Sequence, residues 1–247
     1  MVDGPEDCRR VPHAVADPTS GDTGGMSALA RAARCFPLVG LGIGLLGALV
    51  YGLAVVLDLP PLLAALCAVA AMVAVTGALH EDGLADTVDG FGGGADRERK
   101  LQIMRDSRIG TYGVIALVLA LGARIVALAS FEDNADAIAA LILCQAASRA
   151  LVVAVMQRAP LARSDGLAAS AGRPTQATML WALGLGGLIA VVLAGLDGAV
   201  AAVVGAAVAW AVAWLAQRQI GGVTGDVLGA VQQGSEIAML LALVALD

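Results

Sequence analysis

The sequence predicts an all-α fold, a polytopic integral membrane bundle of about seven transmembrane helices with a cytoplasmic N-terminus. Hydrophobic residues make up 59% of the 247 residues and charged residues 15%, whereas soluble domains contain roughly 45–50% and about 25%. The apolar residues form long blocks, and roughly 20 apolar residues are what a helix needs to cross a bilayer. The basic residues gather in alternate loops, which gives the orientation.

The N-terminal segment 1–26 lies outside this pattern. It is polar and without periodicity, which is typical of a disordered tail. It lacks the apolar stretch after a basic start that marks a signal peptide. We therefore expect a tail over 1–26 and a single membrane-embedded domain over 27–247. The net charge of −6, without a basic tail, gives no reason to expect a nucleic-acid partner.

Seven apolar segments follow one another along the chain. They cover 38–57, 61–80, 112–130, 136–157, 177–195, 198–216 and 228–246. The last contains Gln232, Gln233 and Glu236, so we expect it to be the weakest span, a shorter or partly re-entrant helix. Arginine and lysine precede the first span and follow the second, fourth and sixth, while the other three joints contain none. The positive-inside rule places the basic loops in the cytoplasm.

The most informative feature is an acidic stretch directly after the second apolar segment. Asp82, Asp86 and Asp89 are spaced at i, i+4 and i+7, which puts three carboxylates on one face of a helix. Carboxylates this close repel one another and are costly beside a bilayer. A hard divalent cation would relieve the repulsion, and ligands that are all oxygen favour Mg²⁺ or Mn²⁺. The stretch therefore predicts a metal site at the cytoplasmic surface.

The segment after these acids carries groups suited to phosphate. The glycine run that includes Gly92 and Gly93 is expected to end the helix and leave backbone N–H groups free to approach an anion. Side-chain donors for phosphate follow at Arg105, Ser107 and Arg108, and Asp106 between them adds one more carboxylate as a candidate metal ligand. Metal ligands beside phosphate donors indicate phosphoryl transfer. The alternative, strongest for 96–100, is a solvated loop of mixed charge.

Other candidates lie further along the chain. Asp226, in a glycine-rich turn, is a metal ligand, a base, or a simple turn cap. Arg149 lies inside the fourth span, where an arginine meets an anion or an acid; the alternative is a structural ion pair with Glu236. The loop 163–173 could cover the site or be a plain connector. His80 is either a general base or a structural residue.

Four segments together resemble the cobalamin synthase family, the adenosylcobinamide-GDP ribazoletransferases. They are 77–90 (GALHEDGLADTVDG), 103–113 (IMRDSRIGTYG), 147–149 (ASR) and 221–230 (GGVTGDVLGA). The resemblance runs from about residue 28 to the end. It implies a Mg²⁺-dependent transferase of the bacterial inner membrane, with its active site facing the cytoplasm. The family joins adenosylcobinamide-GDP to α-ribazole or its 5′-phosphate and releases GMP, which completes nucleotide loop assembly in cobalamin biosynthesis.

The resemblance also implies roles for individual residues. Asp82, Asp86 and Asp89 would hold Mg²⁺ against the pyrophosphate, Arg105 and Arg108 would hold phosphate oxygens, and Asp89 or Asp226 would accept the hydroxyl proton. Expected partners are the corrinoid-GDP, ribazole or its phosphate, membrane lipid and other enzymes of cobalamin assembly. The chain departs from the family in lacking a Thr-Arg-Leu-Pro-like element before its first span.

Three other functions fit parts of the pattern. An ion- or proton-coupled transporter would use the acids as a cation site, but it should show inverted repeats and a site at the midplane. A phospholipid-making CDP-alcohol phosphotransferase would need arginine at the position of Asp86. A membrane scaffold without catalytic activity leaves the acids and arginines unexplained.

Overall fold

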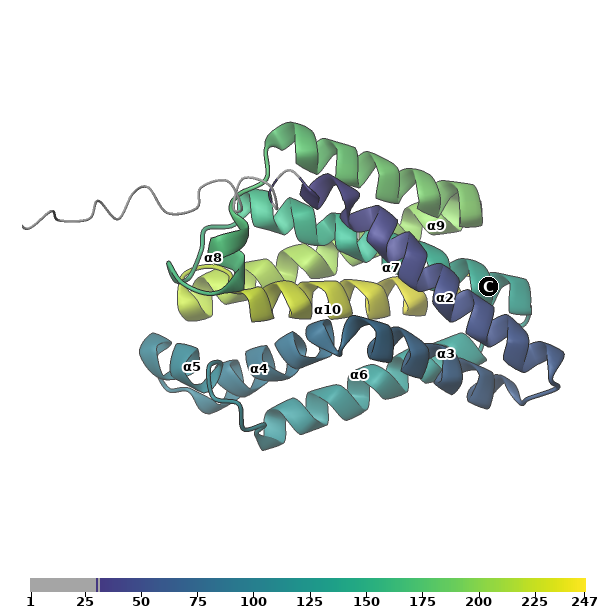
Figure 1. The fold of residues 1–247 in the computed structure, drawn as a ribbon, viewed down its shortest axis with the longest axis horizontal. Coiled ribbons are helices and arrows are strands. Elements are labelled where there is room, and N and C mark those ends of the chain that lie inside the picture. The colour runs from purple at the N-terminus through teal and green to yellow at the C-terminus, as the bar shows by residue number, and fades with distance from the viewer. Residues whose placement is uncertain (1–29, 31) are drawn as a thin grey trace, which may run out of the picture.

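A computed structural model describes Ala30 and residues 32–247 (Figure 1). The predicted tail over 1–26 lies outside these residues. The regular elements of the described part are all helices, and its only β pairing is an isolated bridge between Leu161 and Val223. Its elements are η1 (Ala33–Cys35), α2 (Phe36–Val56), α3 (Pro61–Thr76), α4 (Leu79–Gly93), α5 (Arg97–Ile103), α6 (Thr111–Ala129), α7 (Asn134–Arg158), α8 (Leu167–Ala171), α9 (Gln176–Ile220) and α10 (Gly225–Val244).

The helices agree with the predicted number of spans. Five stretches are long and apolar enough to cross a membrane: η1 with α2, α6, α7, α9 and α10; the bent pair α3 and α4 makes a sixth. The 45 residues of α9 would extend about 68 Å, more than twice the hydrocarbon core of a bilayer. Its backbone leaves the helical conformation at Ala194 and Gly195, where the chain reverses direction (Figure 1). Its two arms therefore count as separate passes, which gives seven.

Glycines let the helices of the bundle pack backbone against backbone. A Cβ atom at Gly40 of α2 would lie 2.2 Å from the carbonyl oxygen of Gln145 in α7, and one at Gly44 would lie 2.7 Å from Ile142 Cα. Close approach of this kind is how transmembrane helices gain packing energy without a hydrophobic driving force. The result is that α7 is buried along most of its length, between α2, α9 and α10.

The second predicted span is broken where the structure approaches the acidic residues. Gly77 and Ala78 both adopt left-handed backbone angles, with φ of 60° and 56°. Their N–H groups bond to the carbonyls of Ala74 and Val73, so α3 is capped at Thr76 and α4 begins at Leu79 in a new direction, at 88°. A left-handed alanine costs roughly 1–2 kcal/mol. The break turns the acidic helix α4 against α10 and α6.

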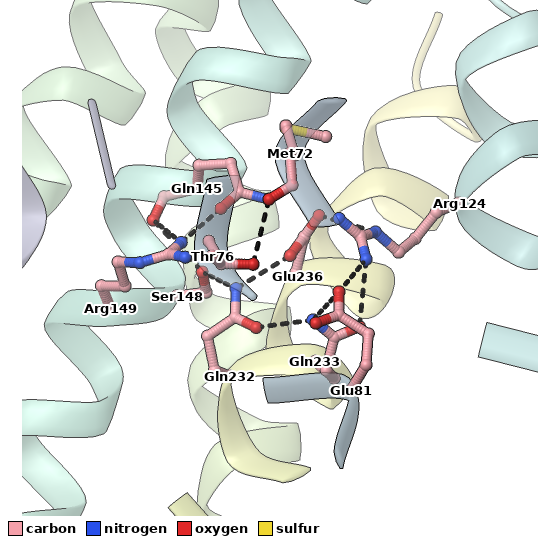
Figure 2. Close-up of polar contacts among 10 residues, drawn as sticks. All are labelled: Met72, Thr76, Glu81, Arg124, Gln145, Ser148, Arg149, Gln232, Gln233 and Glu236. Atoms are coloured by element: carbon pink, nitrogen blue, oxygen red, sulfur yellow. Dashed lines mark hydrogen bonds and ion pairs between the residues drawn. The ribbon is translucent and has the colours of Figure 1, made fainter. Parts of the chain in front are cut away.

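The last predicted span is the least apolar of the five long candidate helices in the described residues, as expected, but the expectation that it is shorter or partly re-entrant is wrong. Helix α10 runs for 20 residues without interruption. Gln232, Gln233 and Glu236, on which that expectation rested, are each at most 2% exposed. They face polar partners from α4, α6 and α7 rather than lipid (Figure 2). A helix surrounded by other helices tolerates polar residues that a lipid-facing helix would exclude.

Candidate active site between α4 and α10

Two glycines bring the acidic helix α4 into direct contact with the start of α10. A Cβ atom at Gly83 would lie 2.8 Å from the carbonyl oxygen of Asp226, and one at Gly229 would lie 3.1 Å from that of His80. Any side chain at either position would push the helices apart. Glycine therefore places the first acids of α4 opposite Asp226, the first acid of α10, although 144 residues separate Asp82 from Asp226 in the sequence.

A cavity of about 220 Å³ lies at this contact, with Asp82, His80, Asp226 and Arg163 among its lining residues. Asp82 is exposed and Asp86 is half-buried. The negative charges of Asp82, Asp226 and Asp89 all act on Asp86, and so does the positive charge of Arg163. Within the described part of the chain, neither Asp82 nor Asp86 has a hydrogen bond or an ion pair through its side chain. The structure thus brings together three of the four carboxylates predicted as catalytic.

The fourth predicted carboxylate, Asp89, has a structural role. Its side chain is buried and accepts hydrogen bonds from the N–H groups of Gly110, at 2.7 Å, and Gly113, at 2.8 Å. Both groups belong to the start of α6, so Asp89 caps that helix from a neighbouring one. Either glycine would collide with Asp89 if it carried a Cβ atom. These two bonds occupy one acceptor position on each oxygen of Asp89 and fix the orientation of its carboxylate.

The glycine run ends helix α4, as predicted, but it does not form an open loop. The helix continues to Gly93 and Gly94 is its C-cap, so Gly92 and Gly93 are part of its last turn rather than an open anion-binding loop. A Cβ atom at Gly92 would lie 2.9 Å from the ring of Tyr112 in α6. Glycine at this position therefore serves the packing of α4 against the start of α6.

The predicted phosphate donors lie near the same end of the bundle but do not line the cavity. Arg105 binds both carboxylate oxygens of Asp165, at 2.7 and 2.8 Å. Arg108 pairs with Asp106 at 2.7 Å, and its hydrogen bonds lower the pKa of that carboxyl to about 2. Ser107, between them, is exposed. Each of the two arginines is therefore paired with a carboxylate near the surface, and an incoming phosphate could displace that carboxylate.

The loop between α7 and α9 covers the cavity, as one of the two interpretations of 163–173 expected. Its Arg163 lines the cavity and lies 3.5 Å from Asp226. One of the terminal guanidinium nitrogens of Arg163 is buried without a hydrogen-bond partner in the described residues. The loop is fixed from α5, because Arg97 donates to the carbonyls of Ala162, at 2.6 Å, and Ile220, at 2.9 Å. Arg97 had no signal in the sequence beyond its charge.

Behind the cavity, a buried polar network joins four helices (Figure 2). Arg124 of α6 donates to Glu81 of α4 at 2.8 Å and lies 2.9 Å from Glu236 of α10. Gln233 donates to Glu81 at 3.1 Å and Gln232 donates to Glu236 at 2.8 Å. Further members come from α7: Ser148, which accepts from Gln232, and Arg149, which donates to Gln145.

This network changes the interpretation of two predicted residues. Arg149 does not pair with Glu236, because Arg124 occupies that carboxylate. Arg149 is held by Gln145 within its own helix instead. Arg124 was missed in the sequence, although a single arginine within the apolar segment 112–130 was the signal for it.

The carboxylates at the cavity have the chemistry that Mg²⁺ requires. Asp82, Asp86 and Asp226 offer hard oxygen donors, and the first two have no competing partner in the described residues. No three His, Cys, Asp or Glu side chains in that part of the chain lie close enough together to enclose a metal ion. Mg²⁺ is usually bound through one or two carboxylates, with substrate phosphates and water completing its shell. The donor set fits that mode of binding.

The fold and the cavity define a polytopic helical membrane protein with an acidic, arginine-bearing site at one end of the bundle. The family model described as cobalamin-5-phosphate synthase matches residues 10–244, so the chain belongs to this family and is a transferase.

Proteins named adenosylcobinamide-GDP ribazoletransferase are close relatives of this chain. One from Bradyrhizobium diazoefficiens is 50% identical over 88% of the chain and 84% of its own length. One from Sinorhizobium medicae is 47% identical over 87% and 86%, and one from Mesorhizobium japonicum is 48% identical over 89% and 85%. No solved structure matches the chain.

Proposed function

We propose that this protein joins adenosylcobinamide-GDP to α-ribazole or its 5′-phosphate and releases GMP, in the late steps of cobalamin biosynthesis. The observation that carries the proposal is the cavity between α4 and α10, where Asp82 and Asp226 line one space together with the partly buried Arg163. The chain's family and the names of its relatives point to these substrates. The reaction is a displacement at phosphorus, which needs charge neutralisation and a group to accept the proton of the attacking hydroxyl.

Asp82 and Asp86 are the residues that would hold Mg²⁺, and Asp226, opposite them, is left free to act on the acceptor. When bound there, the ion neutralises charge on the pyrophosphate of the corrinoid substrate. Asp82 is exposed at the edge of the cavity, where a phosphate attached to a bulky group can reach it. Asp106, also predicted as a ligand, belongs to the Arg108 ion pair and is a less suitable donor.

Asp226 is the better placed of the two candidate bases. It lines the cavity, whereas both oxygens of Asp89 already accept backbone hydrogen bonds. The hydroxyl of Thr224 donates to Asp226 at 3.1 Å and fixes the orientation of the carboxylate. Asp226 would take the proton of the ribazole hydroxyl as that oxygen bonds to the phosphorus next to the corrinoid. The bond from that phosphorus to the oxygen of GMP then breaks.

Arg163 would stabilise the charge that develops on the phosphate groups. Its side chain lines the cavity, and one guanidinium nitrogen has no hydrogen-bond partner in the described residues. That nitrogen is available to donate a hydrogen bond to an anion. Arg105 acts on the same loop by holding Asp165. An incoming phosphate could displace Asp165 from Arg105 and Asp106 from Arg108.

The cavity would face the cytoplasm of a bacterium, from the inner membrane. Figure 1 shows α5, α8 and the start of α10 at one end of the bundle. The basic loops that contain Arg97, Lys100 and Arg163 lie at that end. The opposite joints, such as Asp197, carry no arginine or lysine, and basic loops remain in the cytoplasm.

The test is GMP release by the purified protein in detergent with Mg²⁺ and both substrates. Asp82→Asn should abolish turnover while leaving the protein folded in the membrane, because the amide is a much poorer Mg²⁺ ligand of nearly the same shape. Asp197→Asn, at an exposed joint far from the cavity, is the matched control and should keep full activity. A folded wild-type protein that releases no GMP would contradict the proposed function, and an active Asp82→Asn would remove the metal role of Asp82.

A further inference from the structure

The cavity between α4 and α10 has a polar side and an apolar side. Asp82, Asp226 and Arg163 form the polar side. The apolar side is contributed by α2, α7 and α8, through Phe36, Val152, Met156, Ala168 and Ala171. The proposed displacement at phosphorus uses the polar side alone. The apolar side therefore needs a separate explanation.

The size of the cavity limits what can occupy it. Its volume is about 220 Å³, which is smaller than the roughly 300–1,000 Å³ of pockets that enclose drug-sized ligands. A corrinoid macrocycle cannot enter such a space. A flat bicyclic base can, and the ribose attached to it would then lie beside the acids. Of the two proposed substrates, the nucleoside is the one that matches both the volume and the two-sided lining.

Resting on the proposed function, we propose that the apolar side binds the aromatic base of the acceptor nucleoside. Phe36 offers a ring face for stacking and Met156 a polarisable sulfur, both of which favour aromatic ligands. With the base against these residues, the ribose hydroxyls are directed toward Asp226. The corrinoid-GDP stays outside, and its pyrophosphate reaches Asp82 from the open edge.

The short helix α8 leaves space for the base because the residues that it contributes to the cavity are small. It lies between Gly166 and Gly172, whose φ angles of 89° and 76° allow the chain to fold tightly over the cavity. It presents two alanines, Ala168 and Ala171, to the apolar side. A large side chain at Ala168 would take up space in this cavity and in a second one beside it, because Ala168 lines both, whereas Phe36 lines only the first.

The experiment measures KM for each substrate separately in Phe36→Leu and Ala168→Phe. Phe36→Leu removes a stacking partner, so KM for α-ribazole or its phosphate should rise by about tenfold. Ala168→Phe should also raise this KM, because it fills space that the base needs. KM for the corrinoid-GDP should not change. Equilibrium dialysis of the nucleoside alone should show the same loss of affinity without any turnover.

Two control variants keep the test specific. Trp181→Leu changes an aromatic residue that is 74% exposed on α9. Leu161→Phe fills a neighbouring cavity of about 340 Å³, which Leu161 lines and Phe36 does not. Both should leave the two KM values unchanged. If Leu161→Phe raises KM for the nucleoside while Phe36→Leu does not, the base binds elsewhere and the proposal is overturned.

Failure of this inference can be told apart from failure of the proposed function. An active wild-type protein whose Phe36→Leu variant has an unchanged KM for the nucleoside overturns the inference and leaves the function intact. The inference is also overturned if Phe36→Leu raises KM for the corrinoid-GDP rather than KM for the nucleoside. A wild-type protein that releases no GMP contradicts the function itself. If Ala168→Phe misfolds, Phe36→Leu decides between these outcomes, because it only removes volume and leaves the backbone unstrained.

Discussion

Replacing Arg124 by leucine should strongly destabilise the folded protein. The side chain of Arg124 is 2% exposed, and its partners Glu81 and Glu236 are 8% and 2% exposed. The substitution removes the ion-pair partner of both buried carboxylates, and the only other cation whose charge acts on them in the described residues, Arg149, makes no direct contact with either. Both belong to helices that form the candidate site, α4 and α10, so the repulsion acts directly on that contact.

The expected loss of folding free energy depends on the hydrogen bonds that Glu81 and Glu236 keep after the substitution. Removing one partner of a buried ion pair typically costs about 3–5 kcal/mol. In membranes, single polar contacts average only about 0.6 kcal/mol, because the unfolded state also finds partners. Here Gln233 still donates to Glu81 and Gln232 still donates to Glu236. We therefore expect about 3 kcal/mol, the low end of the buried-pair range.

The measurement is the free energy of unfolding in mixed micelles, by titration with a denaturing detergent. Arg108→Leu is the matched control, because its ion pair with Asp106 is exposed and should contribute little. Adding Glu81→Gln and Glu236→Gln to Arg124→Leu should recover part of the loss, since no buried carboxylate without an ion-pair partner remains and only the buried Arg149, held by Gln145, keeps a charge. The reasoning is refuted if Arg124→Leu and Arg108→Leu unfold alike, or if neutralising both acids recovers nothing.

Three further outcomes are expected. Asp89→Ala should destabilise the protein by about 1–2 kcal/mol through loss of the α6 cap, seen as earlier unfolding; an unchanged midpoint would remove the capping role. Gly83→Ala should cost about 1–3 kcal/mol and reduce GMP release, because its Cβ atom would lie 2.8 Å from the Asp226 carbonyl. Gly42→Ala, with open space around it, is the control and should behave as wild type. Chelation by EDTA should stop GMP release and added Mg²⁺ restore it; full activity after chelation would exclude the metal.

Most of the fold could be predicted because transmembrane helices obey a length and a composition rule. The apolar segments, the joint at Asp197 and the alternation of basic loops were all visible in the sequence. The break at Gly77 and Ala78 was not, because alanine favours a right-handed helix and gives no local signal for a left-handed angle. The integrity of α10 was also hidden, since polar residues such as Gln232 look unfavourable until their partners are known.

The candidate site was predictable where spacing along one helix defines it. Helical periodicity alone places Asp82 and Asp86 on one face of a helix. Their position directly after an apolar block indicates a functional role, because carboxylates are costly beside a bilayer. The assignment of Asp89 to a helix cap required knowledge of where Gly110 and Gly113 lie. Arg163 likewise became a site residue through the path of its loop, which no local pattern specifies.

The sequence by itself determined the class of protein, its spans, the end that carries the acids and the family, because these depend on composition, period and motif. The tertiary structure alone decided which acids remain unpaired and which are already bound. It set Asp226 opposite Asp82 through contacts at Gly83 and Gly229, and it joined Arg124 to Glu81 and Glu236. The physical reason is that a charge's role depends on its partners, and partners distant in the chain meet only when the helices pack.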